Sequence, residues 1–350
     1  MLSAQTRRAV ERVTWLACLI FTGCKLEAQT NQALILNDRG VDAAAHSDYV
    51  QAERLYREAI RIWRGMGSRY DAHTATTLFN LGSVLCNEGD ARQGVQVLEE
   101  ASELHRRALG AKHIRTVRNL SLLGYAYVQA GDLDRADATL TEALADEKEL
   151  YPNDLVLAET LLSLSLSQRL RGKLDDALQL GEESLSAALR TGGELTGDAA
   201  LAYENVATVH RLAGRPQRAL PLFRKARFIY EHTLGPDSPP LESLISQEGL
   251  ALFEDGEVGL AGQELSQAVQ ALTLAGPASE YRLATAEDNL ALLRLRQRKF
   301  ADAERLLNHA LSIEQRLPSR PVFETTTTLE LLVQLRKARR GDASAVRPSH

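Results

Sequence analysis

The sequence has little of several residue types that would narrow its class. Only three of its 350 residues are cysteines, and aromatic residues make up 5%. An odd, sparse set of cysteines gives neither a disulfide framework nor the paired spacing of a zinc site. Few aromatic and β-branched residues, beside abundant Leu, Ala, Glu and Arg, favour helices over strands. The net charge is −5, and nucleic-acid binding usually needs a surplus of basic residues, so we expect no nucleic-acid partner.

Motifs of catalytic chemistry are also missing. The sequence contains no Gly-rich phosphate loop, no His-Glu-x-x-His pattern and no Gly-x-Ser-x-Gly nucleophile elbow. Its eight histidines are scattered, and neighbouring glutamates such as Glu99-Glu100 are typical of a solvated helix surface. We therefore expect no enzyme activity, no cofactor and no metal.

Long apolar runs are absent, and the one short run lies near the start. Arg7, Arg8 and Arg12 precede the apolar stretch from Val13 to Thr22. A basic start followed by a short apolar run is typical of a secretory signal, and this run is too short to span a bilayer. We expect residues 1–28 to be a signal peptide and the protein to be exported to the bacterial periplasm, the envelope or the medium.

Two alternatives for this segment stay open. The sequence Phe21-Thr22-Gly23-Cys24 is similar to a bacterial lipobox, in which lipidation of Cys24 would tether the chain to a membrane. Beyond such an anchor we expect no membrane contact. Alternatively, residues 2–22 form an extra helix at the start of the fold and the protein is cytoplasmic, which the acidic Glu11 favours.

A turn dipeptide recurs along the chain at intervals of 41 or 42 residues. Glycine after a helix adopts the left-handed conformation that ends it, and an acidic residue caps the next helix. The seven dipeptides are Ser47-Asp48, Gly89-Asp90, Gly131-Asp132, Gly172-Lys173, Gly214-Arg215, Gly256-Glu257 and Arg298-Lys299. Helix breakers recur between them at Gly110, Pro152, Gly193, Gly235-Pro236, Gly276-Pro277 and Pro318. Two breakers per period predict two helices per repeat.

Three columns of the repeat contain only small residues. Five residues after the turn come Ala52, Gly94, Ala136, Ala177, Ala219, Ala261 and Ala303. Twelve after it come Ala59, Ala101, Ala143, Ser184, Ala226, Ala268 and Ala310, and seven before it come Gly40, Gly82, Gly124, Ser165, Ala207, Gly249 and Ala291. Such columns let helix axes approach closely, so we expect small residues of the two helices to face each other. Larger residues such as Tyr56 and Leu98 fill the space beside them, and Gly181 breaks their column.

These patterns predict an all-α fold in four parts. Seven repeats of about 42 residues cover residues 29–320, after the signal peptide. Residues 321–340 form a capping helix, whose Leu329, Leu332, Val333 and Leu335 we expect to cover the last repeat. Residues 341–350 form a disordered tail.

The Leu/Gly/Ala/Phe/Ala skeleton resembles the tetratricopeptide repeat (TPR), whose commonest form has a 34-residue period. The longer period, with Asn80-Leu81-Gly82 and the linker Leu234-Gly235-Pro236-Asp237, is similar to the kinesin-light-chain type. The resemblance covers about residues 31–317. It implies a right-handed superhelical solenoid that binds a protein or peptide. Chaperone-binding members carry a Lys/Asn clamp, which is missing here, since the matching residues include Glu204 and Thr208.

The same resemblance implies where a partner would sit. First-helix positions three before and four or five after the small residue line the concave groove; Ser121 and Ser246 fall at the first of them. The candidates for peptide binding are Phe79, Arg118, Leu162, Arg169, Glu204, Arg211 and Phe253. Apolar and cationic side chains on an acidic protein suit a segment with acidic and apolar side chains. Alternatively, these arginines pair with neighbouring carboxylates and hold no ligand. A lipid-anchored envelope assembly subunit is the alternative to a non-catalytic binding scaffold.

Overall fold

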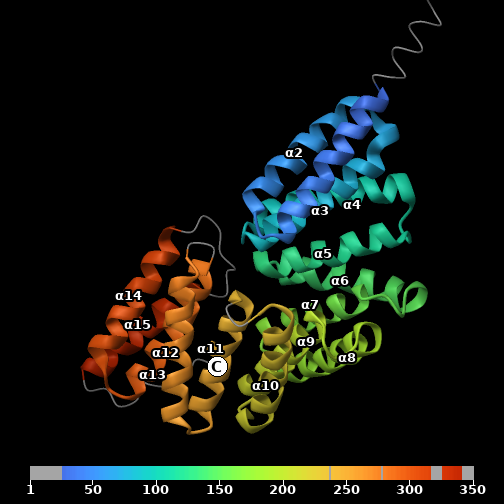
Figure 1. Cartoon of the computed structure of the whole chain (residues 1–350). Helices are drawn as coiled ribbons and strands as arrows, with labels where there is room; N and C mark the ends of the chain where they lie inside the picture. Colours follow the sequence, from blue (N-terminus) through green and yellow to red (C-terminus); the bar gives the residue numbers. More distant parts are fainter. Residues whose placement is uncertain (1–25, 236–237, 277–278, 317–324, 341–350) are drawn as a thin grey trace, which may run out of the picture. The chain divides into compact units, whose positions relative to one another are not determined.

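The computed structural model describes residues 26–235, 238–276, 279–316 and 325–340. Throughout these ranges the regular structure is helical and no strand occurs, which confirms the all-α class (Figure 1). Residues 1–25, including the lipidation candidate Cys24, lie outside the described residues, as do 317–324 and 341–350.

The described helices follow one another as pairs joined by short turns. In chain order they are a helix over residues 26–45 with α2 (Tyr49–Met66), α3 (Asp71–Asn87) with α4 (Ala91–Leu109), α5 (Ile114–Ala130) with α6 (Leu133–Leu150), α7 (Val156–Leu170) with α8 (Leu174–Gly192), α9 (Gly197–Leu212) with α10 (Pro216–Thr233), α11 (Pro239–Glu254) with α12 (Val258–Leu274), α13 (Glu280–Arg296) with α14 (Phe300–Arg316), and finally α15 (Thr325–Arg339). A short 3-10 helix, η1 (Ser68–Tyr70), precedes α3.

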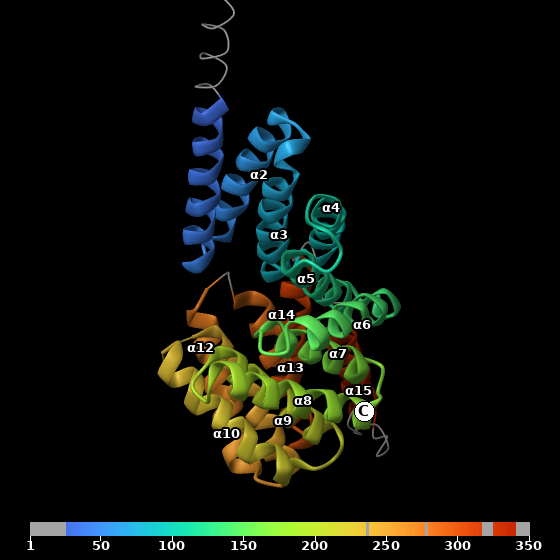
Figure 2. The same cartoon turned by 90° about the vertical axis from the view of Figure 1, so that its right-hand side faces the viewer.

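The chain divides into two compact units. The N-terminal unit comprises Met1–Glu88 and Gln93–Asn119, and the C-terminal unit comprises Gly89–Arg92 and Leu120–His350. Within the N-terminal unit the helix over residues 26–45, α2 and α3 lie side by side (Figures 1 and 2). Ala33 and Leu36 of the first of these helices share a core cluster with Leu55 and Trp63 of α2.

Every turn position of the repeat has a positive φ angle. The values run from 59° at Arg298 and 60° at Ser47 to 93° at Gly256, with the other four glycines between them. Next to the turns, the side chains of Asp48 and Asp132 accept hydrogen bonds from backbone amides in the first turns of α2 and α6. The left-handed turns between helices therefore occur where the repeat period predicts them, including at Ser47 and Arg298, which are not glycine.

A glycine on a first helix leaves room for a large side chain of the second helix. A Cβ atom added to Gly82 would lie 2.5 Å from Leu98, and one added to Gly40 would lie 2.6 Å from the Tyr56 ring. Small residues also face each other, as expected: a Cβ atom added to Gly94 would lie 3.6 Å from the Gly82 carbonyl oxygen, and Ser165 Oγ donates to the Ala177 carbonyl oxygen at 2.6 Å. The large side chain fills the space that the missing Cβ of the glycine leaves. The fourth repeat reverses the sizes, since its first helix carries Ser165 and its second helix carries Gly181.

Helix α15 covers the last repeat with a face that agrees with the prediction only in part: Leu335 and Leu332 pack there as expected, and Leu331 joins them. Leu331 and Leu335 are each 2% exposed and pack against Ala291, Leu295, Ala303 and Leu307. Leu332 is partly buried there, but Leu329 and Val333 are 50% and 49% exposed. The prediction for Leu329 and Val333 was wrong because they stand two residues before the buried pair, which is about 200° around a helix.

Candidate functional site

One buried column of the second helices carries several polar residues. It stands 16 residues after each turn position and contains Trp63, His105, Glu147, Ala188, Tyr230, Leu272 and Glu314. None of these residues is more than 5% exposed. Buried polar groups are costly unless they are hydrogen-bonded. Their partners therefore show which first-helix residues meet this column.

In the third repeat the column holds a hydrogen-bonded carboxyl group. Ser121 Oγ donates to Glu147 Oε1 at 2.7 Å, and Thr160 Oγ1 lies 2.9 Å from the same oxygen and 2.8 Å from Ser121 Oγ. Burial raises the pKa of Glu147 to about 7, although both hydroxyl groups stabilise the charged form. Ser121 is only 5% exposed and faces the second helix of its own repeat, so it does not line a groove.

In the fifth repeat the equivalent pair is Glu204 and Tyr230. The Tyr230 hydroxyl donates to Glu204 Oε2 at 3.1 Å. Burial raises the pKa of Glu204 to about 7, against the effects of that hydrogen bond, of Arg169 and of Arg282. Burial and the neighbouring carboxylate also raise the pKa of Tyr230 above its usual range. The carboxyl group of Glu204 on α9 thus contacts α10 through Tyr230 and lies within the electrostatic reach of α7 and α13.

A second charged pair joins two first helices, α9 and α11. Arg211 Nη1 of α9 donates to Glu254 Oε1 of α11 at 2.7 Å, and the two side chains are 11% and 28% exposed. Burial raises the pKa of Glu254 although Arg211 opposes this. Arg211 therefore fits the alternative in which the arginines pair with neighbouring carboxylates.

The other candidates differ in their surroundings. Leu162 and Arg169 of α7 are half-buried, and Phe253 of α11 packs partly against the core. Phe79 is half-buried and Arg118 is exposed, and both belong to the N-terminal unit. Among the predicted residues, Arg169 acts electrostatically on Glu204, and Arg211 forms an ion pair with Glu254.

Sequence reasoning missed Tyr230 and Arg282. The sequence does contain a signal for Tyr230, because this residue belongs to a repeat column in which polar and aromatic residues recur at a buried position. Arg282 left none, because its approach to Glu204 joins helices two repeats apart and depends on their packing.

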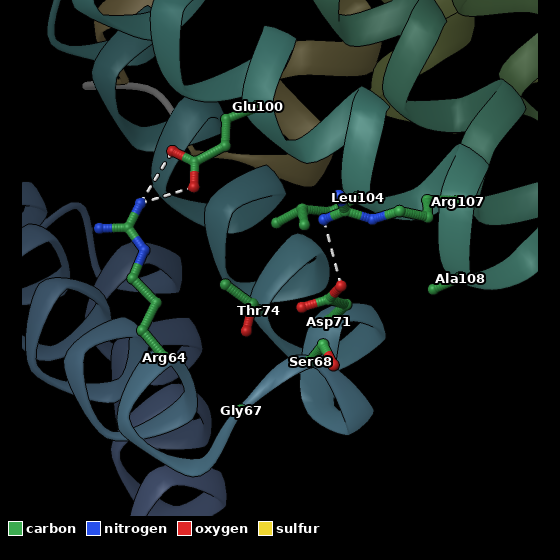
Figure 3. A pocket seen from close by; sticks show the side chains of 9 residues that line it. All are labelled: Arg64, Gly67, Ser68, Asp71, Thr74, Glu100, Leu104, Arg107 and Ala108. Atoms are coloured by element: carbon green, nitrogen blue, oxygen red, sulfur yellow. Dashed lines mark hydrogen bonds and ion pairs between the residues drawn. The ribbon is translucent and has the colours of Figure 1, made fainter.

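The N-terminal unit contains a cleft of about 550 Å³ along α2, α3 and α4. Figure 3 shows two arginines reaching across it to carboxylates. Arg64 Nη2 donates to both oxygens of Glu100 at 2.6 and 2.8 Å, and Arg107 Nη2 donates to Asp71 at 3.2 Å. Both arginines are more than half exposed, so each pair contributes little to stability.

A cleft of about 560 Å³ in the C-terminal unit is lined by α12, α13 and α14. His309 Nδ1 lies 2.8 and 2.9 Å from the two carboxyl oxygens of Glu287. Burial raises the pKa of Glu287 against the pull of His309. Across the described residues no group of three or more metal-binding side chains forms, and none of their helices is long and apolar enough to cross a membrane.

Comparison with known families gives one match. A model described as tetratricopeptide repeat matches residues 73–149 and 156–232, which correspond to α3–α6 and α7–α10. No curated protein matches the sequence.

Solved structures share the fold at low sequence identity. Aspartyl phosphate phosphatase F from Bacillus subtilis has a TM-score of 0.64 at 13% identity, over 86% of this chain and 75% of its own. The Rap conjugation gene regulator of plasmid pLS20, solved with the Phr* peptide, has a TM-score of 0.63 at 14% identity, over 79% and 72%. BtubC from P. vanneervenii has a TM-score of 0.53 at 21% identity, over 64% and 91%. At these identities the likeness establishes the fold alone.

The matched repeats, the helix pairs and these neighbours agree on an all-α solenoid of helix-turn-helix repeats. They support a protein-binding repeat scaffold, while nothing among them supports a lipid-anchored assembly subunit. The chain contains tetratricopeptide repeats, which the family model matches over residues 73–149 and 156–232.

Proposed function

We propose that the chain is a non-catalytic scaffold whose first helices bind a peptide, or an extended segment of another protein, in a concave groove. The binding surface proposed in the C-terminal unit consists of Leu162, Arg169, Glu204, Arg211 and Phe253, and we call it the inner wall. Half-buried Leu162 and Phe253 offer apolar contact, and the charged residues between them offer orientation. Apolar contact with a few placed polar groups is the usual composition of a binding site.

One observation carries the proposal. Arg169 of α7 and Arg282 of α13 both act on the carboxyl group of Glu204, whose pKa burial has raised to about 7. Charged side chains are rarely buried, and perturbed carboxyl groups concentrate at functional sites. The likeness to a Rap regulator solved with a peptide adds support for a peptide as the partner.

The test is selection of peptides on the full chain, followed by affinity measurement. A random peptide library is panned on the immobilised protein, and the selected peptides are titrated by fluorescence anisotropy. We expect the double variant Arg169→Gln with Arg282→Gln to weaken binding at least tenfold, because each arginine contributes a charge-assisted contact. Circular dichroism and thermal melting establish that the variant is folded.

The matched control replaces two arginines away from the inner wall. Arg135→Gln with Arg339→Gln removes cations that pair with Asp132, the N-cap residue of α6, and with Glu304 of α14. This control should bind like the wild type. Equal affinity of the wild type and the Arg169/Arg282 variant would exclude the inner wall, and a library that yields no specific peptide would contradict the proposed function.

A further inference from the structure

Helix α15 stands in the position of the first helix of an eighth repeat. Thr328 Oγ1 of α15 lies 2.5 Å from Glu314 Oε1 of α14, a residue that comes 16 positions after its turn. In the same way, Thr160 Oγ1 of α7 lies 2.9 Å from Glu147 Oε1 of α6, which also comes 16 positions after its turn. A hydroxyl group of a first helix thus meets a carboxyl group of the preceding second helix at both places. Helix α15 therefore packs on the seventh repeat in the register in which α7 packs on the third.

Two columns that are buried in the seven repeats are exposed on α15. In this register Leu329 corresponds to Leu161 and Val333 to Ser165, and the second helix α8 covers both of these α7 residues. The column of Leu161 is at most 8% exposed in every repeat, and it contains Leu36, Leu78, Leu120, Leu161, Tyr203, Ile245 and Glu287. Leu329 and Val333 are instead 50% and 49% exposed. Within the described ranges, therefore, no second helix covers this side of α15.

Leu329 and Val333 form what we call the open face of α15, and it does not suit a second helix of the repeat type. In other repeats a glycine at the position of Val333 leaves room for a large side chain, and a Cβ atom added to Gly249 would lie 2.8 Å from Leu265. The branched side chain of Val333 takes up that room. The open face therefore fits a helix whose apolar side chains pack between Leu329 and Val333, rather than one that inserts a leucine at the position of Val333.

Charged residues of opposite sign stand on either side of Val333. Glu330 precedes it by three residues and Arg336 follows it by three; both are exposed, and neither forms an ion pair among the described residues. An antiparallel second copy of α15, related by a two-fold axis at Val333, would bring each Glu330 opposite the other copy's Arg336. Such flanking pairs set the partner and the orientation of a helix pair. The further cations Lys337 and Arg340 would lie about 12 and 20 Å from their counterparts along the axis, beyond a screening length of about 8 Å.

We propose that α15 pairs with the α15 of a second copy of this chain, antiparallel about a two-fold axis near Val333, so that the protein forms a homodimer. Leu329 and Val333 of each copy pack against those of the other, in the place that a second helix takes in the seven repeats. The pairs between Glu330 and Arg336 fix the antiparallel direction. The side of α15 that holds the last repeat is a different one, so the pairing leaves that contact intact.

Sedimentation velocity of the full chain over a range of concentrations tests the pairing. One helix pair is a small interface, so we expect a monomer–dimer equilibrium with a dissociation constant in the micromolar range. Val333→Glu places like charges beside each other at the two-fold axis, and should weaken the dimer at least about tenfold. The matched control is Val258→Glu, which makes the same change at an exposed position of α12 and should leave the equilibrium as in the wild type. Circular dichroism and thermal melting establish that both variants are folded.

Charge reversal tests the antiparallel direction. Glu330→Arg leaves only cations at the flanking positions, and Arg336→Glu leaves only carboxylates, so each variant should self-associate at least about threefold more weakly than the wild type. Mixed together, the two variants should form a heterodimer about as tight as the wild-type dimer, because every flanking pair again joins opposite charges.

Three results would overturn the proposal. A monomer at every concentration would leave the open face to another occupant, such as residues 341–350 or a helix of another protein. Equal dimerisation of the wild type and Val333→Glu would place the dimer contact elsewhere. Mixed charge variants that associate no better than each one alone would exclude the antiparallel pair. Peptide binding at the inner wall is independent of all three results, since that surface lies on α7, α9 and α11.

Discussion

Tyr230 stands at the repeat position that Glu147 fills two repeats earlier, and both are hydrogen-bonded to the first helix of their own repeat. Each comes 16 residues after its turn glycine, and each partner comes ten residues before that glycine. One member of either pair is a carboxyl group, supplied by the second helix in one case and by the first helix in the other. The same contact between first and second helix therefore contains a structural carboxyl group, Glu147, in one repeat and the candidate binding residue Glu204 in another.

Glu147 should make the C-terminal unit less stable at alkaline pH. Its pKa is raised from 4.5 to about 7, so the folded chain holds a proton that the unfolded chain releases across this window. The free energy of unfolding therefore falls as pH rises, by roughly 3 kcal/mol over the full window. Urea unfolding at pH 5.0, 6.5 and 8.0 should show this slope, and Glu147→Gln should reduce it. Glu204 adds a slope of the same sign, so an unaltered slope in the double variant Glu147→Gln with Glu204→Gln would refute the assignment.

His105 should give the N-terminal unit the opposite pH dependence. Burial, with Arg115 and His113, lowers the pKa of His105 from 6.5 to about 4. The unfolded chain then binds a proton that the folded chain does not, so stability is lost as pH falls from 6.5 toward 4. With Trp15→Phe in the background, Trp63 fluorescence reports urea unfolding of this unit alone. The midpoint should drop between pH 7 and pH 5, and His105→Gln should abolish the drop; an equal drop in both proteins contradicts the prediction.

Two glycine-to-alanine changes in the N-terminal unit should have opposite signs. Gly82→Ala places a Cβ atom 2.5 Å from Leu98, so overpacking should cost about 1–3 kcal/mol. Gly65→Ala meets nothing within 4 Å on an exposed part of α2, and should stabilise by about 0.5–1 kcal/mol. Denaturant unfolding compares the two. Leu98→Ala should cost less in the Gly82→Ala background than alone, since the added Cβ fills part of the space that it empties, and strict additivity would argue against the contact.

The repeat pattern predicted the turns because their causes are local. A left-handed residue must follow the helix at each turn, and glycine supplies it at five of seven positions. The column of small residues seven positions before the turn was predicted for a local reason too. A glycine there lacks the Cβ atom that would otherwise touch the adjacent helix. The large residues beside the small columns were also predicted, and Leu98 and Tyr56 fill the space at Gly82 and Gly40.

The exposure of first-helix positions was predicted less well because it depends on the direction of side chains around the helix. The position three before the small residue is only about 60° from it, and so still lies near the second helix. Ser121 and Ser246, which were expected at the wall, are 5% and 2% exposed for this reason. Glu204 stands at the same position, and the electrostatic effect of Arg282 of α13 on it depends on tertiary packing that no local pattern records.

Export remains a prediction from residues 1–28, and we propose it on their sequence alone. Protein isolated from its native host should begin at Gln29, or at a modified Cys24 if the lipobox is used. N-terminal sequencing together with mass spectrometry distinguishes the two products. A protein recovered from the cytoplasm with its first residues intact would show that the segment is retained.

Replacing Arg298 in the last turn with glycine should stabilise the fold. Its φ of 59° lies in the left-handed region, where a side chain costs about 1–2 kcal/mol that glycine avoids. Glycine also loses more freedom on folding, so the net gain for Arg298→Gly should be about 0.5–1 kcal/mol. The reverse change, Gly214→Ala, puts a Cβ on a residue with φ of 69° and should cost about 1 kcal/mol or more. Denaturant unfolding monitored by circular dichroism tests both, and a loss of stability in Arg298→Gly would mean that the arginine side chain contributes more than its backbone strain costs.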